Sequence, residues 1–467
     1  MDARAEDTAL TDATLLDAQP AGAALLAAPR FDQLAVSDEQ YREYEQLTKR
    51  LSKKTGVDAQ QYHLGCVVRL DRGFPAVCCA DATLRAQYAP VFSRDAAQVA
   101  RDSDKSSRSA ARASRDAALR TSRQPSSGKK VPACASRAED AYEGVAVGDW
   151  VVVRRPHAHD MGVIEAVIKR KNQLARWRGS RRGTQQVLAA NVDVVFIAQP
   201  LLDAAASVAT NLPAAQNSAP ALDINRIIRS LVIARDCSAR PVIVLTKADR
   251  ITQHDQLIEQ ILLLRRVVGT DIPVVVTSSS PTWQPSTQVS PLASAPFSAK
   301  PQTEVPDLAQ WGLEALRSYA VEKTCTLVLG ESGAGKSSLL NALLGHEALQ
   351  TAEVRASDDA GRHTTVARRM VKIPHGGVII DAPGLRNLAL MGHEQGLSLV
   401  FSDIVDAAQD CKFRDCTHAH EPGCQVMQAI CSEHIAPERL AAYAALAQEM
   451  ESAARSLAPD IDPAMLP

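Results

Sequence analysis

A glycine-rich loop limits this chain to a small group of folds: Gly330-Glu331-Ser332-Gly333-Ala334-Gly335-Lys336-Ser337. It matches the pattern G-x-x-x-x-G-K-[ST], in which glycines let successive backbone N–H groups turn toward a phosphate. The apolar run Cys325–Leu329 before the loop predicts a strand, and the segment from Lys336 to Leu344 predicts a helix. A phosphate loop in this context requires an α/β sheet, with the loop at the carboxyl end of a strand.

The loop also predicts individual roles. Lys336 is expected to reach the outer phosphates, and the Ser337 hydroxyl is expected to bind Mg²⁺. The set of phosphate-binding residues comprises Gly330, Glu331, Ser332, Gly333, Ala334, Gly335, Lys336, Ser337 and Ser338.

The choice of base comes from Thr246-Lys247-Ala248-Asp249, which ends the apolar run Pro241–Leu245. In the motif N/T-K-x-D the aspartate accepts two hydrogen bonds from the guanine edge, and the lysine stem lies along the base. Adenine presents a different donor pattern, so Asp249 would face an unpaired partner and ATP would be rejected. These four residues therefore favour GTP over ATP.

A third motif, Asp381-Ala382-Pro383-Gly384, follows the apolar run Val378–Ile380 and begins 45 residues after Lys336. Its aspartate is expected to hold Mg²⁺ through water, and the Gly384 N–H to sense the terminal phosphate. A threonine of the intervening G-R-H-T-T segment, either Thr364 or Thr365, is expected to bind Mg²⁺ as well.

The order of these motifs is unusual, because Asp249 precedes Lys336 by 87 residues. Ordinary GTPases place guanine recognition after D-x-x-G. A circular permutation retains the same site while moving the termini, and it places whatever follows Gly384 directly after the switch region. Nucleotide state then has a direct route to a C-terminal domain.

The rest of the chain predicts a multidomain fold. Short runs with turn glycines, such as Cys66–Leu70 and Trp150–Arg154, favour an N-terminal OB-like β-barrel. Apolar runs alternating with helical segments favour a permuted P-loop α/β domain, followed by a zinc-binding helical domain. The expected ranges are an N-terminal extension (1–61, partly helical or disordered, with no identifiable chemistry), the barrel (62–190, disordered insertion near 101–130), the GTPase domain (191–390, loop insertion near 281–306) and the C-terminal domain (391–467).

Three cysteines and a histidine crowd into fourteen residues near the C-terminus: Cys411, Cys416, His418 and Cys424. A Cys₃His set at this spacing suits one closed, tetrahedral, structural Zn²⁺ rather than disulfides, and leaves no open position for catalysis. Redundant candidates are His420, Cys431 and His434.

A run without any acidic residue, from Ala166 to Val192, suggests contact with RNA. Seven basic residues fall within fourteen positions around Trp177: Lys169, Arg170, Lys171, Arg176, Arg178, Arg181 and Arg182. Such density suits phosphate contacts with one stacking group, although a solvated basic face has the same composition. No run of about 20 apolar residues predicts a membrane span, and the acidic first ten residues do not open like a secretory signal, so we expect a cytoplasmic protein.

Together these motifs resemble the ribosome small-subunit-dependent GTPase A family, from about Tyr62 to the C-terminus. The resemblance rests on T-K-A-D, the phosphate loop, G-R-H-T-T, P-H-G-G-V-I-I-D-A-P-G-L-R and C-K-F-R-D-C-T-H. It implies GTP hydrolysis stimulated by the small ribosomal subunit and its rRNA during late maturation. Thr246 stands where many members have Asn, and Val366 stands where a third threonine is common.

Catalysis is the least determined part, because Leu385 occupies the position after D-x-x-G where many GTPases have a water-orienting glutamine. Slow intrinsic turnover with stimulation by a partner is therefore expected. His363 is a candidate to position water, and an exposed loop histidine without that role is the alternative. Two other readings are a GTP-sensing RNA-binding module with negligible hydrolysis and an ATP-dependent P-loop enzyme. We expect a monomer, because no coiled-coil heptad is visible.

Overall fold

The computed structural model describes residues 28–70, 74–89, 144–156, 161–178, 184–201, 222–251, 254–280, 283, 308–331, 333–345, 368–381, 390 and 392–457. The predicted insertion near 101–130 lies outside these residues, as does the one near 281–306 except for Trp283. Within the described part, no helix has the length and apolar character needed to cross a membrane.

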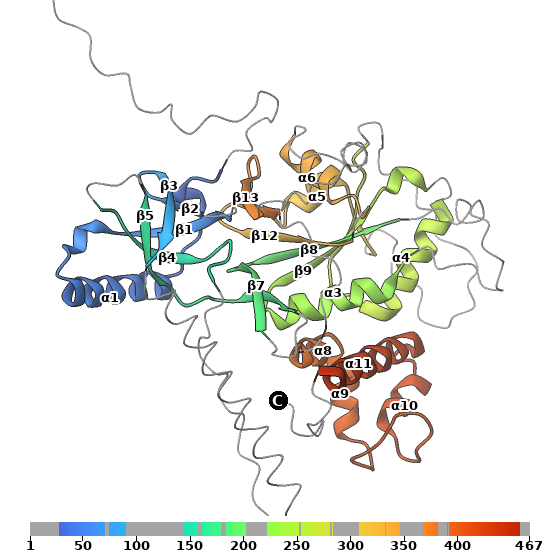
Figure 1. Cartoon of the computed structure of the whole chain (residues 1–467). Coiled ribbons are helices and arrows are strands. Elements are labelled where there is room, and N and C mark those ends of the chain that lie inside the picture. Colours follow the sequence, from blue (N-terminus) through green and yellow to red (C-terminus); the bar gives the residue numbers. More distant parts are fainter. Residues whose placement is uncertain are drawn as a thin grey trace, which may run out of the picture.

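The N-terminal part of the molecule contains a closed barrel of five strands (Figure 1). Its strands are β1 (Tyr62–Leu70), β2 (Pro75–Cys79), β3 (Thr83–Tyr88), β4 (Trp150–Arg154) and β5 (Gly162–Val167). Strand β1 pairs with both β2 and β4, and a parallel pairing of β3 with β5 closes the ring. Alternate side chains such as Val67, Val151 and Ile164 fill its interior. The predicted barrel is confirmed.

Residues before the barrel are packed onto it rather than forming a separate appendage. They form η1 (Phe31–Gln33), α1 (Asp38–Thr55) and η2 (Ala59–Gln61). Ser37 caps α1 in a capping box with Gln40, and Gly56 ends the helix in the left-handed conformation. The Phe31 ring meets the buried Trp150 ring edge-on at 5.6 Å between centroids.

A largely parallel sheet continues from the barrel. It comprises β8 (Val194–Pro200), β9 (Arg240–Thr246), β10 (Val274–Val276), β11 (Gln310–Trp311), β12 (Cys325–Leu329), β13 (Arg368–Lys372) and β14 (Val378–Asp381). The strand order is β11-β10-β9-β8-β12-β14-β13, and β13 pairs antiparallel with β1 of the barrel. A separate hairpin joins β6 (Gln173–Arg178) to β7 (Thr184–Ala190).

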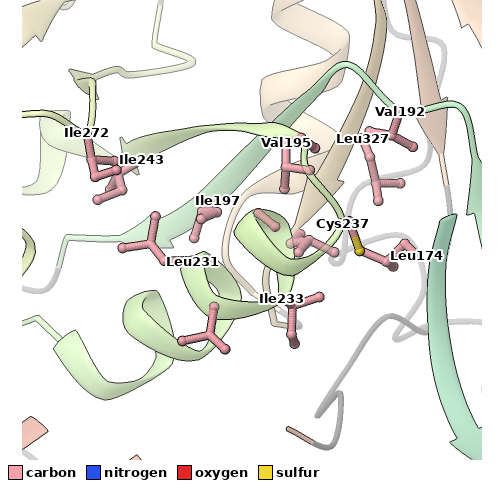
Figure 2. Packing of buried hydrophobic residues seen from close by; sticks show 14 of the residues in the cluster. Leu174, Val192, Val195, Ile197, Leu231, Ile233, Cys237, Ile243, Ile272 and Leu327 are labelled. Carbon is pink, nitrogen blue, oxygen red and sulfur yellow. The ribbon is translucent and has the colours of Figure 1, made fainter. Parts of the chain in front are cut away.

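Helices cover both faces of this sheet, because alternate strand residues point to opposite sides. Val195 and Ile197 of β8 pack with α3 (Ile224–Asp236) and α4 (His254–Val268), as Figure 2 shows for α3. Phe196 of the same strand packs instead with α5 (Gly312–Arg317) and α6 (Lys336–Leu344).

The last described residues, 392–457, form a group of helices below α3 in Figure 1. They are α8 (Glu394–Val400), α9 (Ser402–Gln409), α10 (Gln425–Cys431) and α11 (Pro437–Leu457). Gly396 of α8 lies so close to α3 that an added Cβ would come within 2.1 Å of the Val232 carbonyl oxygen. Nδ1 of His393 lies 2.8 Å from the Asp236 carboxylate, which joins the two elements at the end of α3.

Candidate nucleotide and metal sites

Two sequence motifs that lie far apart in the chain meet at the carboxyl ends of two strands of the same parallel sheet. β9 ends at Thr246 and β12 ends at Leu329, and β8 lies between them. The buried Thr246 hydroxyl donates a hydrogen bond of 2.8 Å to the carbonyl of Ala334 in the glycine-rich loop. The structure thus brings the T-K-A-D segment against the loop before α6.

The path of this loop depends on glycine. Gly333 and Gly335 have φ values of 81° and 77°, in the left-handed region that other residues rarely adopt. At Gly330 an added Cβ would lie 2.6 Å from the Ala198 carbonyl oxygen. The backbone therefore turns tightly between β12 and α6, and the positive end of α6 faces the turn.

Lys336 opens α6 and folds its side chain back over the loop. Its ammonium donates to the carbonyl oxygens of Gly330, at 2.6 Å, and Glu331. The Glu331 carboxylate in turn pairs with Arg226 at 2.7 Å, which ties the loop to the first turn of α3. The cation of Lys336 therefore lies against the backbone of the loop and is partly exposed.

The T-K-A-D segment is held by the strand beside it. Lys247 has a φ of 61°, and its Cε lies 3.7 Å from the Cβ position of Gly335, so its stem runs along the loop. Partial burial lowers the pKa of this ammonium, with a smaller contribution from Arg250, and Asp249 opposes both. The Ala248 N–H donates to the Thr277 carbonyl at 3.2 Å.

Ser278 is a site residue that the sequence analysis missed. It is buried just after β10, and its hydroxyl donates to the exposed carboxylate of Asp249. The available signal was the Thr277-Ser278-Ser279 segment directly after the apolar run Ile272–Val276, since the ends of such strands line the same edge of a parallel sheet. Ser278 therefore orients Asp249.

Replacing Ser278 with Ala is expected to weaken GTP binding by about 5- to 10-fold. The lost hydrogen bond orients Asp249 and does not contact GTP itself, so only part of its worth, about 1–1.5 kcal/mol, should appear in the affinity. Isothermal titration calorimetry measures this change. Ser279→Ala is the matched control, because Ser279 is exposed and adjacent. Equal affinities of the two variants would contradict the orienting role.

Part of the predicted site lies outside the described residues: Ser332, Thr364, Thr365 and Gly384, together with His363 and Leu385. Asp381 is described, at the end of β14. Since β14 pairs in parallel with β12, Asp381 lies one strand away from the glycine-rich loop.

A second site gathers the four predicted metal ligands. The ligand atoms of Cys411, Cys416, His418 and Cys424 all lie within 4.8 Å of one another. The Cys411 and Cys424 sulfurs are 3.9 Å apart, and they lie 3.7 Å and 3.5 Å from Nδ1 of His418. Two sulfurs bound at about 2.3 Å to a tetrahedral zinc are about 3.8 Å apart, so the set fits Zn²⁺.

The loop that carries these ligands is braced by Glu421. Its carboxylate accepts hydrogen bonds from the backbone of Thr417 (2.9 Å), Ala419 (3.1 Å) and His420 (3.2 Å), and from the Thr417 hydroxyl. The Thr417 hydroxyl bond and then the backbone bonds hold the pKa of Glu421 well below its usual range. The other candidate ligands, His420, Cys431 and His434, are not in the four-residue cluster.

Replacing Cys416 with Ser is expected to remove the bound zinc and destabilise α10, because structural zinc sites couple metal binding to folding. Elemental analysis of the purified protein should fall from about one zinc per chain to near zero, and amide exchange in α10 should rise. Cys431→Ser is the matched control, since Cys431 is exposed and outside the cluster. A variant that retains full zinc would contradict the assignment.

The basic stretch expected to contact RNA is partly used inside the protein. Arg170 makes a bidentate ion pair with the fully buried Asp149, at 2.6 and 2.7 Å, and so holds β4 against the loop after β5. Lys171 pairs with Asp193 at 2.8 Å. Arg181 and Arg182 lie outside the described residues, and the side chains of residues 176–178 are not described.

The arrangement of a glycine-rich loop, a helix N-terminus and a base-recognition segment at one sheet edge defines an α/β nucleotide-binding protein. Residues 300–391 match the family model described as RsgA GTPase. The small ribosomal subunit biogenesis GTPase RsgA of Methanosarcina acetivorans is 36% identical over 304 residues, which cover 65% of this chain and 69% of the relative.

The protein of the same name from Streptomyces avermitilis is 34% identical over 313 residues, covering 66% of this chain and 70% of the relative. The crystal structure of YjeQ from Thermotoga maritima matches with a TM-score of 0.48 and 21% identity, covering 83% of this chain and 98% of that one. The chain belongs to the RsgA family of small ribosomal subunit biogenesis GTPases. It is therefore a GTPase of small-subunit biogenesis, and the ATP-dependent reading is excluded.

Proposed function

We propose that this protein binds GTP at the sheet edge formed by β9, β10 and β12, and hydrolyses it when the small ribosomal subunit engages it late in maturation. The observation that carries this proposal is the Thr246–Ala334 hydrogen bond of 2.8 Å, which holds the T-K-A-D segment against the phosphate loop. A permuted chain would thereby assemble the site that an ordinary GTPase builds in another order.

Each half of the nucleotide would have its own partners. The Asp249 carboxylate, oriented by Ser278, would accept hydrogen bonds from the guanine N–H groups, and the Lys247 stem would cover the base. The loop backbone and the Lys336 ammonium would hold the phosphates, once the ammonium exchanges its two carbonyl partners for phosphate oxygens. In this division, base recognition lies at the ends of β9 and β10 and phosphate recognition at the end of β12, with β8 between β9 and β12.

Mg²⁺ fits the oxygen donors that flank the loop. Ser337 lies in the first turn of α6 and Asp381 ends β14, the neighbour of β12, and either Thr364 or Thr365 would complete the set. The ion would neutralise charge on the β- and γ-phosphates. Because Leu385 cannot orient water, the subunit would have to complete or order the site. The rate of GTP hydrolysis would therefore be slow for the protein alone and higher with the subunit bound.

The protein would bind the rRNA of the small subunit. The barrel and the C-terminal helices that hold the zinc would provide contact surfaces for this rRNA. We propose a monomer acting in the cytoplasm, where ribosome assembly provides that partner. A GTP-sensing module with negligible hydrolysis is the alternative, and Leu385 is the observation in its favour.

The test is GTP hydrolysis by the purified chain with no subunits, with small subunits and with large subunits, using a Lys336→Ala blank. We expect stimulation of at least about 10-fold by small subunits alone, because a partner that completes a GTPase site can add 10³-fold or more. Equal slow turnover in all three conditions would favour the sensing module instead.

A further inference from the structure

The second half of α1 carries a set of cations that the rest of the protein does not use. Lys49, Arg50, Lys53 and Lys54 are exposed, and the chain has no acidic residue from 46 to 57. None of the four makes an ion pair with a described residue, in contrast to Arg170 and Lys171, which pair with aspartates. We call these four residues the α1 cation face.

Helical geometry places these side chains together. Positions i, i+1, i+4 and i+5 lie on one side of an α-helix, spread over about 140° of its circumference. Leu47 and Leu51 lie on the adjoining side of the helix, half-buried and packed against the core. The barrel therefore fixes which way the α1 cation face points, and Figure 1 shows α1 at the end of the molecule away from the C-terminal helices.

The helix that presents these cations is fixed to the barrel. The Gln40 amide donates to Asn191 at 3.0 Å, and the Tyr44 hydroxyl donates to the Tyr62 carbonyl at 2.9 Å. At the other end, the Thr55 and Tyr62 hydroxyls are hydrogen-bonded at 2.9 Å. A ligand on this face would therefore bind cations on a preorganised backbone, which lowers the entropic cost of association.

We infer that the α1 cation face binds the phosphate backbone of RNA, as an additional contact to the small-subunit partner of the proposed function, on which this inference rests. Clustered, unpaired cations complement a polyanion, and release of its counterions drives the association. A membrane surface is a poorer match, because residues 46–54 expose no large apolar side chain that would enter a bilayer. Part of the RNA-binding charge thus lies in the N-terminal extension, to which the sequence assigned no chemistry.

The test compares full-length variants for binding to small subunits and to protein-free small-subunit rRNA over a range of salt concentrations. Each lost phosphate contact should cost about 4-fold in affinity near 0.15 M salt and flatten the log K against log salt slope by about 0.7–0.9. Lys49→Gln/Lys53→Gln should therefore lose about 20-fold, and replacement of all four cations about 100-fold or more. Circular dichroism checks that α1 remains folded.

Arg30→Gln/Arg266→Gln is the matched control, because it removes two exposed cations outside α1 that already pair with carboxylates, Arg30 with Asp32 and Arg266 with Glu438. Affinity for rRNA within two-fold of the unmodified protein, or an equal loss in the control, would overturn the inference. So would loss of binding to anionic phospholipid vesicles with rRNA binding unchanged. If the unmodified protein does not bind small subunits, the proposed function is wrong. Its binding to protein-free rRNA then still tests this inference independently.

Discussion

Asp249→Asn is expected to weaken GTP binding by about 10²- to 10⁴-fold and to create affinity for xanthosine triphosphate. Two guanine N–H groups would donate to this carboxylate, and each hydrogen bond to a charged acceptor contributes about 1.5–3 kcal/mol. An asparagine retains one acceptor and presents an amide donor, which opposes the guanine amino group but matches the carbonyl that replaces it in xanthine. The Ser278 hydroxyl can still donate to the remaining oxygen, so the loop should keep its conformation.

The measurement is a pair of titrations, with GTP and with xanthosine triphosphate, on both proteins. Asp255→Asn is the matched control, since it removes an exposed carboxylate from the first turn of α4. A variant that binds GTP as well as the unmodified protein would refute guanine recognition by Asp249. Loss of both nucleotides would indicate that the substitution damages the loop rather than the specificity.

The second large effect concerns Lys336. Lys336→Ala should lower the single-turnover rate of GTP hydrolysis by at least about 10²- to 10³-fold at saturating GTP, because in the proposed site it would remove a fixed cation from the region where charge develops on the phosphates. The Gly330 and Glu331 carbonyls that Lys336 contacts are partly exposed and can bind water instead, so the fold should survive.

Lys323→Ala is the comparison for this variant, because Lys323 is an exposed lysine before β12 on the same chain. Thermal unfolding should show similar stability for both proteins. Hydrolysis by Lys336→Ala at more than a tenth of the unmodified rate would contradict a role for this ammonium in the reaction.

Local patterns predicted the elements around the nucleotide site well. The predicted strand Cys325–Leu329 and helix Lys336–Leu344 coincide with β12 and α6, because a continuous apolar run, a glycine turn and a helix start are all encoded within twenty residues. The Cys₃His set was equally visible, since zinc ligands cluster in sequence. Both motifs carry their own spacing and need no tertiary information.

Features that depend on distant partners were missed. β13 has only two apolar residues among its five, so its sequence shows no strand pattern. It is fixed by its pairing with β14 and β1. The packing of residues 28–61 depends on contacts such as Phe31 with Trp150, more than a hundred positions away. Arg170 looked like an RNA contact because sequence does not show that Asp149 lies beneath it.

The pairing of β13 with β1 has a mechanical consequence. Through Arg69–Arg369 and Leu70–Arg368 the barrel and the α/β sheet form one continuous sheet. A hinge between them would have to break backbone hydrogen bonds, so the two are expected to rotate as one stiff body. The C-terminal helices, by contrast, contact α3 and α4 through side chains, such as His393 with Asp236 and Arg439 with the Val267 carbonyl, and share no sheet with them. The more deformable connection of the molecule is therefore expected at α3 and α4, and a structural change driven by GTP would displace the end that carries the Cys/His cluster while the barrel keeps its orientation.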